Sequence, residues 1–489
     1  MLVPIGFVVV VAVQTGWDVL APLIFRPRVG ELLLNTVLIV VLAVPACVVL
    51  GVATAWLVER TDLPGRHTWR VLLATPLAVP AFVSSYAWAG VIPSIQGLAG
   101  GLFISVLAYT PLVYLPALAA LRGLDPAHED AARCLGLGPV AVFGRVVLPQ
   151  LRLAIWGGGL VVGLHLLAEY GAFSLIRFET FTTAIIVQFQ STFAGPAANA
   201  LGIVLTVLTL LLLTVESSTR GRQRYARVGS GAPARASLMP LRAGRIPALL
   251  LAGGYVVVAV GVPVMVLIRW LGYGEPWAQP EIPQAILTTV GFAALGAVVT
   301  IALAMPAAWL TVRHPSRAAR VIEGAGYVAS SLPAIIIALA LVTVTTRVAP
   351  GMYQTVGTVV IAYAIMFLPR ALTSLRSGIA QAPPLLEDAA RTLGVAPWRT
   401  RARVTLPLIA PSVLAGAALV GLGIANELTA TLLLAPNGTR TLATAFWSAT
   451  SSVAYSSAAP FALLLIVAAI PSVAILLAQT RRGPAAVAT

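Results

Sequence analysis

Two carboxylates in matching sequence settings are the first residues that could do chemistry. Glu169 precedes Tyr170, Glu427 follows Asn426, and both acids lie toward the outer part of an apolar stretch. A carboxylate inside a membrane segment is costly and usually faces a bundle interior or a water-filled cavity. Glu169, Tyr170, Asn426 and Glu427 are therefore candidates for lining a translocation pathway. The alternative is that each acid holds neighbouring segments together by hydrogen bonds.

A histidine near the first acid raises the question of a metal site. His165 lies four residues before Glu169, on the same helical face, and the two could bind a metal ion as a pair. The equivalent of His165 in the second half of the chain is Gly423, so such a pair would occur once. The sequence has no His-Glu-x-x-His run and no clustered histidines. We expect no catalytic residues and no metal site, and the chain is not expected to be an enzyme.

A duplicated polar stretch is suited to protein contact. The run Glu-Asp-Ala-Ala-Arg-x-Leu-Gly, nine residues and then Val-x-Leu-Pro occurs at 129–149 and at 387–407, with 12 of 21 positions identical. Asp125 and Pro126 precede the first copy and suit the start of a helix. A glycine follows each acidic run, Gly136 or Gly394, so we expect each short helix to end in a left-handed cap. The result is a bent helical hairpin with an acidic, small-residue face that fits a groove on a partner. The alternative is a loop that only connects two membrane spans. The residues of the predicted docking face are Glu129, Asp130, Ala131, Ala132 and Gly136 in the first copy and Glu387, Asp388, Ala389, Ala390 and Gly394 in the second.

Composition specifies the elements that must position these residues. Of the 489 residues 59% are hydrophobic and 10% charged, and the mean hydropathy is +0.95, as in an all-α polytopic membrane protein. Stretches long enough to cross a bilayer recur about twelve times. They lie near 2–24, 32–58, 70–92, 99–121, 152–175, 199–215, 246–271, 284–312, 321–346, 354–375, 410–434 and 458–480.

The chain reads as two repeats in the same orientation. We expect a first six-span repeat over 1–216, an arginine-rich linker over 217–245 and a second repeat over 246–489. The first polar loop is 122–150 and the second is 376–408. Because an even number of spans separates equivalent points, the repeats are parallel and their pseudo-two-fold axis follows the membrane normal.

Arginine placement predicts the orientation. All 31 basic residues are arginines, and 25 fall on the side of the polar loops, the linker and the C-terminus. By the positive-inside rule that side is cytoplasmic. The net charge of +15 therefore reflects membrane topology rather than nucleic-acid binding.

Both polar loops resemble one family motif. They match the Glu-Ala-Ala, three residues, Gly, nine residues, Ile-x-Leu-Pro pattern of ABC importer permeases, with Asp130 and Asp388 in place of the motif glutamate. In that family the loop is a coupling helix that docks on the ATP-hydrolysing subunit, so two loops imply two ATPase copies. A Walker A loop needs a lysine, and this chain has none. The resemblance therefore implies that ATP and magnesium are bound by the partner and that no cofactor is bound here.

The surroundings of the two acids resemble a narrower group. Glu-Tyr-Gly-Ala-Phe-Ser-Leu from Glu169 and Asn-Glu-Leu-Thr-Ala-Thr from Asn426 are similar to runs in the fused, two-half permeases of ferric-iron ABC importers. This implies a bacterial cytoplasmic-membrane importer that receives ferric iron, a hard cation favouring oxygen ligands, from an extracytoplasmic binding protein. Related permeases carry thiamine, phosphonates, polyamines or oxyanions such as sulfate. A secondary transporter driven by an ion gradient is the alternative from another class.

Overall fold

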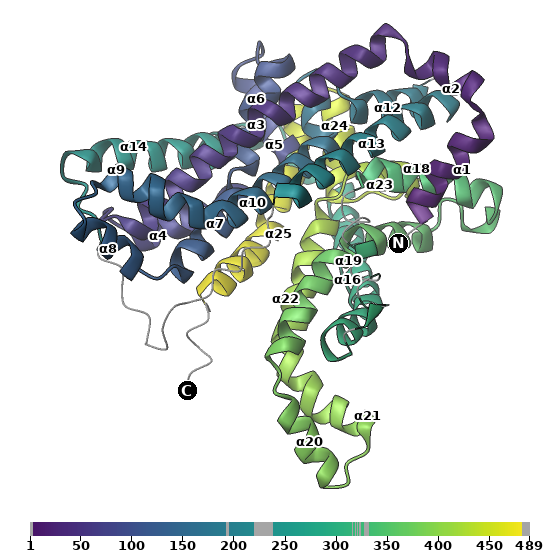
Figure 1. Ribbon diagram of the computed structural model, residues 1–489. Coiled ribbons are helices and arrows are strands. Elements are labelled where there is room, and N and C mark those ends of the chain that lie inside the picture. The colour runs from purple at the N-terminus through teal and green to yellow at the C-terminus, as the bar shows by residue number, and fades with distance from the viewer. Residues whose placement is uncertain are drawn as a thin grey trace. The chain divides into compact units, whose positions relative to one another are not determined.

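The protein folds as an assembly of helices, seen in a computed structural model (Figure 1). The structure describes residues 3–191, 195–219, 238–314, 316–317, 319, 321, 324–326 and 332–481. Within these ranges nine helices are long and apolar enough to cross a membrane, which confirms the all-α polytopic class. They are Pro27–Arg60, Gly97–Gly123, Pro139–Ala168, Pro196–Val215, Arg242–Leu271, Glu281–Arg313, Val356–Gln381, Pro397–Ala425 and Tyr455–Ile475.

The chain divides into two compact units, and each unit draws segments from both sequence repeats. The first-repeat unit comprises Phe25–Val187, Val207–Tyr273 and Ala469–Thr489. The second-repeat unit comprises Met1–Ile24, Gln188–Thr206 and Gly274–Ala468. The N-terminal helix α1 (Val3–Thr15), for example, packs on α18 (Ala334–Arg347) in the second-repeat unit. Folded units and sequence repeats are thus different divisions of this chain.

Three packed helices form the centre of the first-repeat unit. Helices α3 (Pro27–Arg60) and α10 (Leu148–Ala168) both pack against α7 (Pro111–Gly123). Glycines permit the close approach: a Cβ at Gly51 would lie 3.0 Å from the Tyr114 nitrogen, and one at Gly158 would lie 2.9 Å from the Val113 Cα. Such small-residue contacts let membrane helices gain packing energy that lipid does not supply.

The second-repeat unit is organised in the same way. Helices α16 (Glu281–Arg313), α19 (Val356–Gln381) and α22 (Leu406–Ala425) pack on one another in all three pairings. Figure 1 shows α22 leading directly toward the short helices α20 and α21 of the second polar loop. The membrane helices of each unit therefore form the base on which its polar loop stands.

Several predicted spans are broken rather than continuous. The span predicted at 2–24 is divided at Gly16, whose φ of +75° separates α1 from α2 (Trp17–Ile24). The span predicted at 70–92 is a pair of helical segments bent by 89°, and it includes α4 (Arg66–Leu72) and α5 (Ala81–Val91). Helix α18 is the regular part of the span predicted at 321–346, much of whose remainder lies outside the described residues. The same holds for 220–237 of the predicted linker and for 482–489.

Candidate functional site

Each polar loop forms the predicted bent helical hairpin. In the first, α8 (Ala127–Cys134) is followed by α9 (Pro139–Val142), a turn of π-helix at Phe143–Val147 and then α10. In the second, α20 (Pro384–Thr392) is followed by α21 (Pro397–Thr400), a π-helical turn at Arg401–Thr405 and then α22. In both hairpins a π-helical turn therefore connects the short helices to the following membrane helix. Such π-helical turns are often found at functional sites.

The bend of each hairpin depends on one glycine. Gly136 has a φ of +83° and Gly394 a φ of +75°, which confirms the predicted left-handed caps. The N–H of Leu137 donates to the Ala132 carbonyl at 3.1 Å, and the N–H of Val395 donates to the Ala390 carbonyl at 3.1 Å. These bonds from the second residue beyond the helix satisfy carbonyls that the helix end would leave unpaired.

The first glutamate of the docking motif faces inward in the first loop. Glu129 is buried, and its Oε1 accepts a hydrogen bond from Nε of Arg60, at the end of α3, at 2.9 Å. Both side chains are only 6% exposed. Nη2 of Arg60 also donates to the Leu121 carbonyl at 2.8 Å. The expectation of an acidic docking face is therefore wrong for Glu129, because the carboxylate fastens α8 to a membrane helix.

The second loop contains the equivalent glutamate–arginine pair, but its arginine is more exposed to solvent. Glu387 is buried, and its Oε1 accepts from Nη2 of Arg313, the last residue of α16, at 3.1 Å and from the Thr405 hydroxyl at 3.1 Å. The Arg313 side chain is 14% exposed. Arg60 and Arg313 occupy equivalent repeat positions, so the same pair is built twice. Glu387 is likewise not part of an exposed acidic face.

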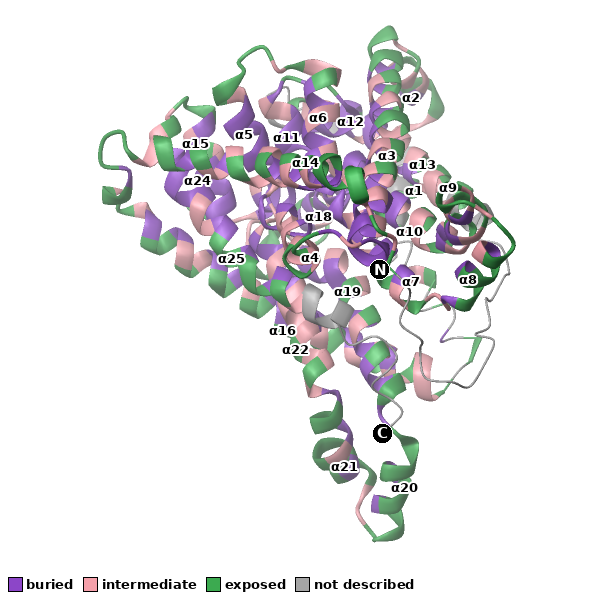
Figure 2. Cartoon of the chain, turned by 90° about the vertical axis from the view of Figure 1, so that its left-hand side faces the viewer, coloured by how far each residue is buried: buried purple, intermediate pink, exposed green. Residues whose placement is uncertain are grey.

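The exposed face of each hairpin is partly acidic and partly apolar. Asp130, Ala131, Asp388 and Ala389 are exposed as predicted, whereas Ala132 and Ala390 are buried. Directly before the glycine bends, Leu135 is 84% exposed and Leu393 is 82% exposed. Val140 and Trp398, which are also equivalent, are exposed too. Figure 2 shows the largely exposed surface of α20 and α21. Large exposed apolar residues at equivalent places are typical of a contact surface.

The apolar part of this face was missed from the sequence. Leucine occupies the same place in both copies, at Leu135 and Leu393, and this repetition was the sequence signal that could have identified the apolar contact residues.

The aromatic packing behind the exposed face is also repeated. Trp56 meets Phe143 edge-on with ring centroids 5.6 Å apart, and its equivalent Trp309 lies 5.3 Å from the Arg401 guanidinium carbon.

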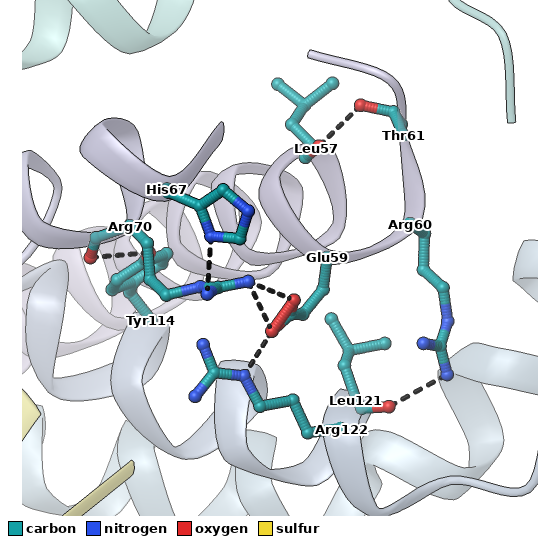
Figure 3. Close-up of polar contacts among 9 residues, drawn as sticks. All are labelled: Leu57, Glu59, Arg60, Thr61, His67, Arg70, Tyr114, Leu121 and Arg122. Carbon is teal, nitrogen blue, oxygen red and sulfur yellow. Dashed lines mark hydrogen bonds and ion pairs between the residues drawn. The ribbon is translucent and has the colours of Figure 1, made fainter. Parts of the chain in front are cut away.

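A cluster of charges behind the first polar loop was also missed. Glu59 lies between two arginines, with Nη2 of Arg70 at 2.9 Å from Oε2 and Nε of Arg122 bonded to Oε1 (Figure 3). The Tyr114 hydroxyl donates to the Arg70 carbonyl at 3.1 Å. The cluster ties α3, α4 and α7 together. The repeat equivalent of Glu59 is Val312, so the second repeat lacks the central carboxylate.

The two acids inside the apolar spans lie at helix breaks. Helix α10 ends at Ala168, and the short α11 (Gly171–Leu175) follows; α22 ends at Ala425, and α23 (Thr429–Leu434) follows. Oε1 of Glu169 accepts from the Ala172 N–H at 2.8 Å, and Oε1 of Glu427 accepts from the Ala430 N–H at 2.9 Å. Each acid thus caps the helix after the break, so neither predicted span, 152–175 or 410–434, is one continuous helix.

The two acids differ in what else they meet. Oε2 of Glu169 accepts a hydrogen bond from the hydroxyl of Tyr109, the last residue of α6 (Gly97–Tyr109). Glu427 interacts electrostatically with Arg370 of α19. Arg370 lies within α19, and its Nη1 lies beside Gly423 of α22. Neither partner was predicted, since each comes from a distant segment.

The remaining candidates have mixed surroundings. Tyr170 is buried, and Oδ1 of Asn426 is buried without a hydrogen-bond partner among the described residues. Nδ1 of His165 donates to the Val161 carbonyl at 2.8 Å. Within the described ranges no group of three or more His, Cys, Asp or Glu residues is arranged to hold a metal ion. A pathway role for Glu169, Tyr170, Asn426 and Glu427 stays a prediction.

Comparison with known proteins gives consistent matches. The family model for the binding-protein-dependent transport system inner membrane component matches residues 19–217 and 300–482. The Fe(3+)-transport system permease protein FbpB 2 of Haemophilus influenzae is 35% identical over 474 residues, covering 95% of this chain and 93% of that protein. The sulfate transport system permease protein CysW of Escherichia coli is 26% identical over 235 residues, covering 43% and 81%. The sulfate permease CysT of Salmonella typhimurium is 28% identical over 236 residues, covering 44% and 84%.

Proposed function

The chain belongs to the family of binding-protein-dependent transport system inner membrane components, and from this membership we propose that it is the permease of an ATP-binding-cassette importer for ferric iron. It receives the ion from an extracytoplasmic binding protein and passes it into the cytoplasm. The observation that carries the proposal is the pair of equivalent hairpins, each fastened by a buried Glu–Arg pair and each presenting an exposed leucine. A secondary transporter has no use for two such surfaces.

Each hairpin contacts one copy of a separate ATPase subunit, which binds ATP and magnesium. The buried Glu129 and Glu387 set the angle of the hairpin, and the exposed Leu135 and Leu393 enter the groove of the partner. Burying an exposed leucine contributes about 1.5–3 kcal/mol, enough to make each tip an anchor of the interface.

Ferric iron is favoured over sulfate by the extent of the matches. The similarity to the ferric-iron permease runs through both repeats, whereas each sulfate permease matches less than half of this chain. Thiamine, phosphonates, polyamines and oxyanions are the competing cargoes.

Transport by the reconstituted complex tests the proposal. The permease, its ATPase and its binding protein are placed in liposomes, and uptake of radioactive iron is followed with and without ATP. We expect ATP-dependent iron uptake and no sulfate uptake. Iron uptake driven by a proton gradient without the ATPase would favour a secondary transporter instead.

Docking is tested by shortening the two exposed anchors of the second loop. Leu393→Ala and Trp398→Ala should reduce co-purification of the ATPase about tenfold, because an anchor loses contact area worth roughly 1–2 kcal/mol. Leu414→Ala, at an exposed position within α22, is the matched control and should leave co-purification unchanged. Equal ATPase recovery with all three variants would contradict the docking role.

The proposed orientation places the polar loops, linker and C-terminus in the cytoplasm of a bacterial cell. Single cysteines at Ser230 and Asn437, in a Cys134→Ser background, are exposed to an impermeant thiol reagent outside intact cells. We expect labelling at 437 and none at 230. Labelling at 230 would reverse the orientation.

A further inference from the structure

The two intramembrane acids share one structural role and differ in the other. In both, Oε1 caps the short helix after the break, at 2.8 Å from the Ala172 nitrogen and 2.9 Å from the Ala430 nitrogen. Capping therefore accounts for one oxygen of each carboxylate. The second oxygen and its surroundings decide what more each acid can do.

In the second-repeat unit the acid already has a cation beside it. A Cβ built on Gly423, near the end of α22, would lie 3.0 Å from Nη1 of Arg370. The guanidinium therefore occupies the space that a side chain at 423 would take. Glu427 follows four residues later, just beyond the helix, and Arg370 interacts with it electrostatically. Arginine keeps its charge in proteins, so the carboxylate of Glu427 has a fixed positive charge nearby. A metal cation approaching this acid would also approach the guanidinium and be repelled by it.

In the first-repeat unit no ion pair joins Glu169 to an arginine of the described ranges. The described contacts of Glu169 are the Tyr109 hydroxyl and the Ala172 N–H, and neither carries a positive charge. The repeat equivalent of Arg370 is Ala117, and that of Gly423 is His165, whose ring lies 5.5 Å from the Tyr109 ring. Glu169 is half-buried as a residue, and both of its carboxylate oxygens accept the hydrogen bonds named above.

A further oxygen lies on the same helix face as the tyrosine. Ser105 is one turn before Tyr109 in α6, and its Oγ is buried without a hydrogen-bond partner in the described part of the chain. Buried hydroxyls are nearly always paired, so an unpaired one suggests that water or a ligand completes it. Phenol, carboxylate and hydroxyl oxygens are the donors that a hard trivalent cation prefers.

We propose that Tyr109 and Glu169 form the cation-contacting site of the pathway, and that Glu427, held by Arg370, takes no part in contacting the ion. The inference rests on the proposed function, with ferric iron as the cargo. When iron arrives, the Tyr109 hydroxyl releases its proton to water, and bonds form from iron to the phenolate and to the Glu169 carboxylate. Water or ligands from the arriving complex are displaced, and no electron is transferred.

The small number of ligands suits passage rather than storage. A transported ion must be bound well enough to enter and weakly enough to leave. Two protein oxygens, with no cluster of three or more metal-binding residues among those described, meet that requirement. The internal repeat therefore supplies two equivalent acids, and the asymmetry of their partners assigns the ion to one of them.

Transport measurements on matched variants test this assignment. In liposomes with the ATPase and binding protein, Tyr109→Phe and Glu169→Gln should lower iron uptake at least tenfold while ATP hydrolysis and thermal stability stay near the wild-type values. The double variant Arg370→Gln with Glu427→Gln should keep more than half of the uptake. Tyr255→Phe is the control, since Tyr255 is another buried tyrosine of this unit whose hydroxyl donates to the Leu107 carbonyl at 3.0 Å.

A spectroscopic measurement is independent of transport. Purified permease in detergent is titrated with ferric nitrilotriacetate, and the phenolate-to-iron charge-transfer absorption is recorded. We expect the band in the wild type and in Tyr255→Phe, and its loss in Tyr109→Phe. A band that persists in Tyr109→Phe would overturn the proposal.

The outcomes separate this inference from the proposed function. A wild-type complex that takes up another cargo and no iron refutes the proposed function and the inference with it. Wild-type iron uptake with unchanged uptake by Tyr109→Phe refutes the inference alone. Uptake lost in the Arg370 and Glu427 double variant as fully as in Glu169→Gln would also refute it, because both acids would then contact the ion.

Discussion

The two polar loops have the same internal construction and different surroundings. Each has a left-handed glycine, a π-helical turn and a buried Glu–Arg pair that joins the hairpin to a membrane helix. Behind the first loop, however, Glu59 joins two further arginines, whereas the second repeat has Val312 at the place equivalent to Glu59. The first hairpin is thus fixed to a charged base and the second to a more apolar one.

The exposed faces of the two hairpins also differ, and here the second loop has the larger apolar side chains. Ala127 and His128 of the first loop correspond to Leu385 and Leu386 of the second, and Val140 corresponds to Trp398. The second loop exposes more apolar area, although its base lacks a counterpart of Glu59. The difference teaches that the hairpin fold needs only the glycine and the Glu–Arg pair, while the base and the contact face vary independently of it.

The largest expected effect comes from removing the buried glutamates. Glu129→Ala leaves Arg60 buried and without its carboxylate, which should cost about 3–5 kcal/mol of unfolding free energy. Glu387→Ala should cost about 1.5–3 kcal/mol, because Arg313 is more exposed and can be hydrated. Chemical denaturation of the detergent-purified protein measures both. Equal losses would show that the two fastenings are equivalent after all.

The charged base of the first loop is the next test. Glu59→Gln leaves Arg70 and Arg122 facing each other and should cost about 1.5–3 kcal/mol, measured in the same way. The double variant Glu59→Val with Arg122→Leu should cost less, since only Arg70 then remains without its carboxylate and an apolar side chain fills the place of the other arginine. A double variant less stable than the single one would contradict this account.

Glycine replacements should affect the two loops equally. A Cβ at Gly136 or Gly394 meets no atom within 4 Å, so Gly136→Val and Gly394→Val should each cost about 1–2 kcal/mol through backbone strain alone. ATPase binding should fall as the bend is misdirected. Gly138→Ala is the control, because its φ is −68° and the second loop has Ala396 at that place. Normal ATPase binding by both valine variants would reduce the loops to connectors.

The smallest effect is expected at the exposed acids. Asp130 pairs with Arg133, and Asp388 pairs with Arg391, each at 3.2 Å on the helix surface. Asp130→Asn and Asp388→Asn should each cost about 0.2–0.5 kcal/mol and lose that effect in high salt. Unfolding at two salt concentrations measures it. A loss above 1 kcal/mol at either site would mean that the exposed acid does more than pair with its neighbour.

Much of the candidate site could be predicted because it depends on local sequence. The acidic run, the glycine bend and the returning proline specify each hairpin within about thirty residues, and the structure has both. The side of the helix that faces inward could not be predicted. Glu129 and Asp130 are adjacent, and only the position of Arg60, 69 residues earlier, decides that Glu129 is buried and Asp130 is exposed.

The sequence by itself determined the membrane class, the duplication and the left-handed caps, because hydropathy, repeat spacing and backbone conformation are properties of neighbouring residues. Only the tertiary structure decided which segments of each sequence repeat belong to which compact unit, and where the spans containing Glu169 and Glu427 break. It also decided that Tyr109 lies beside Glu169 and Arg370 beside Glu427. Each of these depends on helices that are distant in the chain and meet only on packing. Electrostatic partners change steeply with distance, so two acids that are equivalent in the sequence acquire different surroundings in the folded protein.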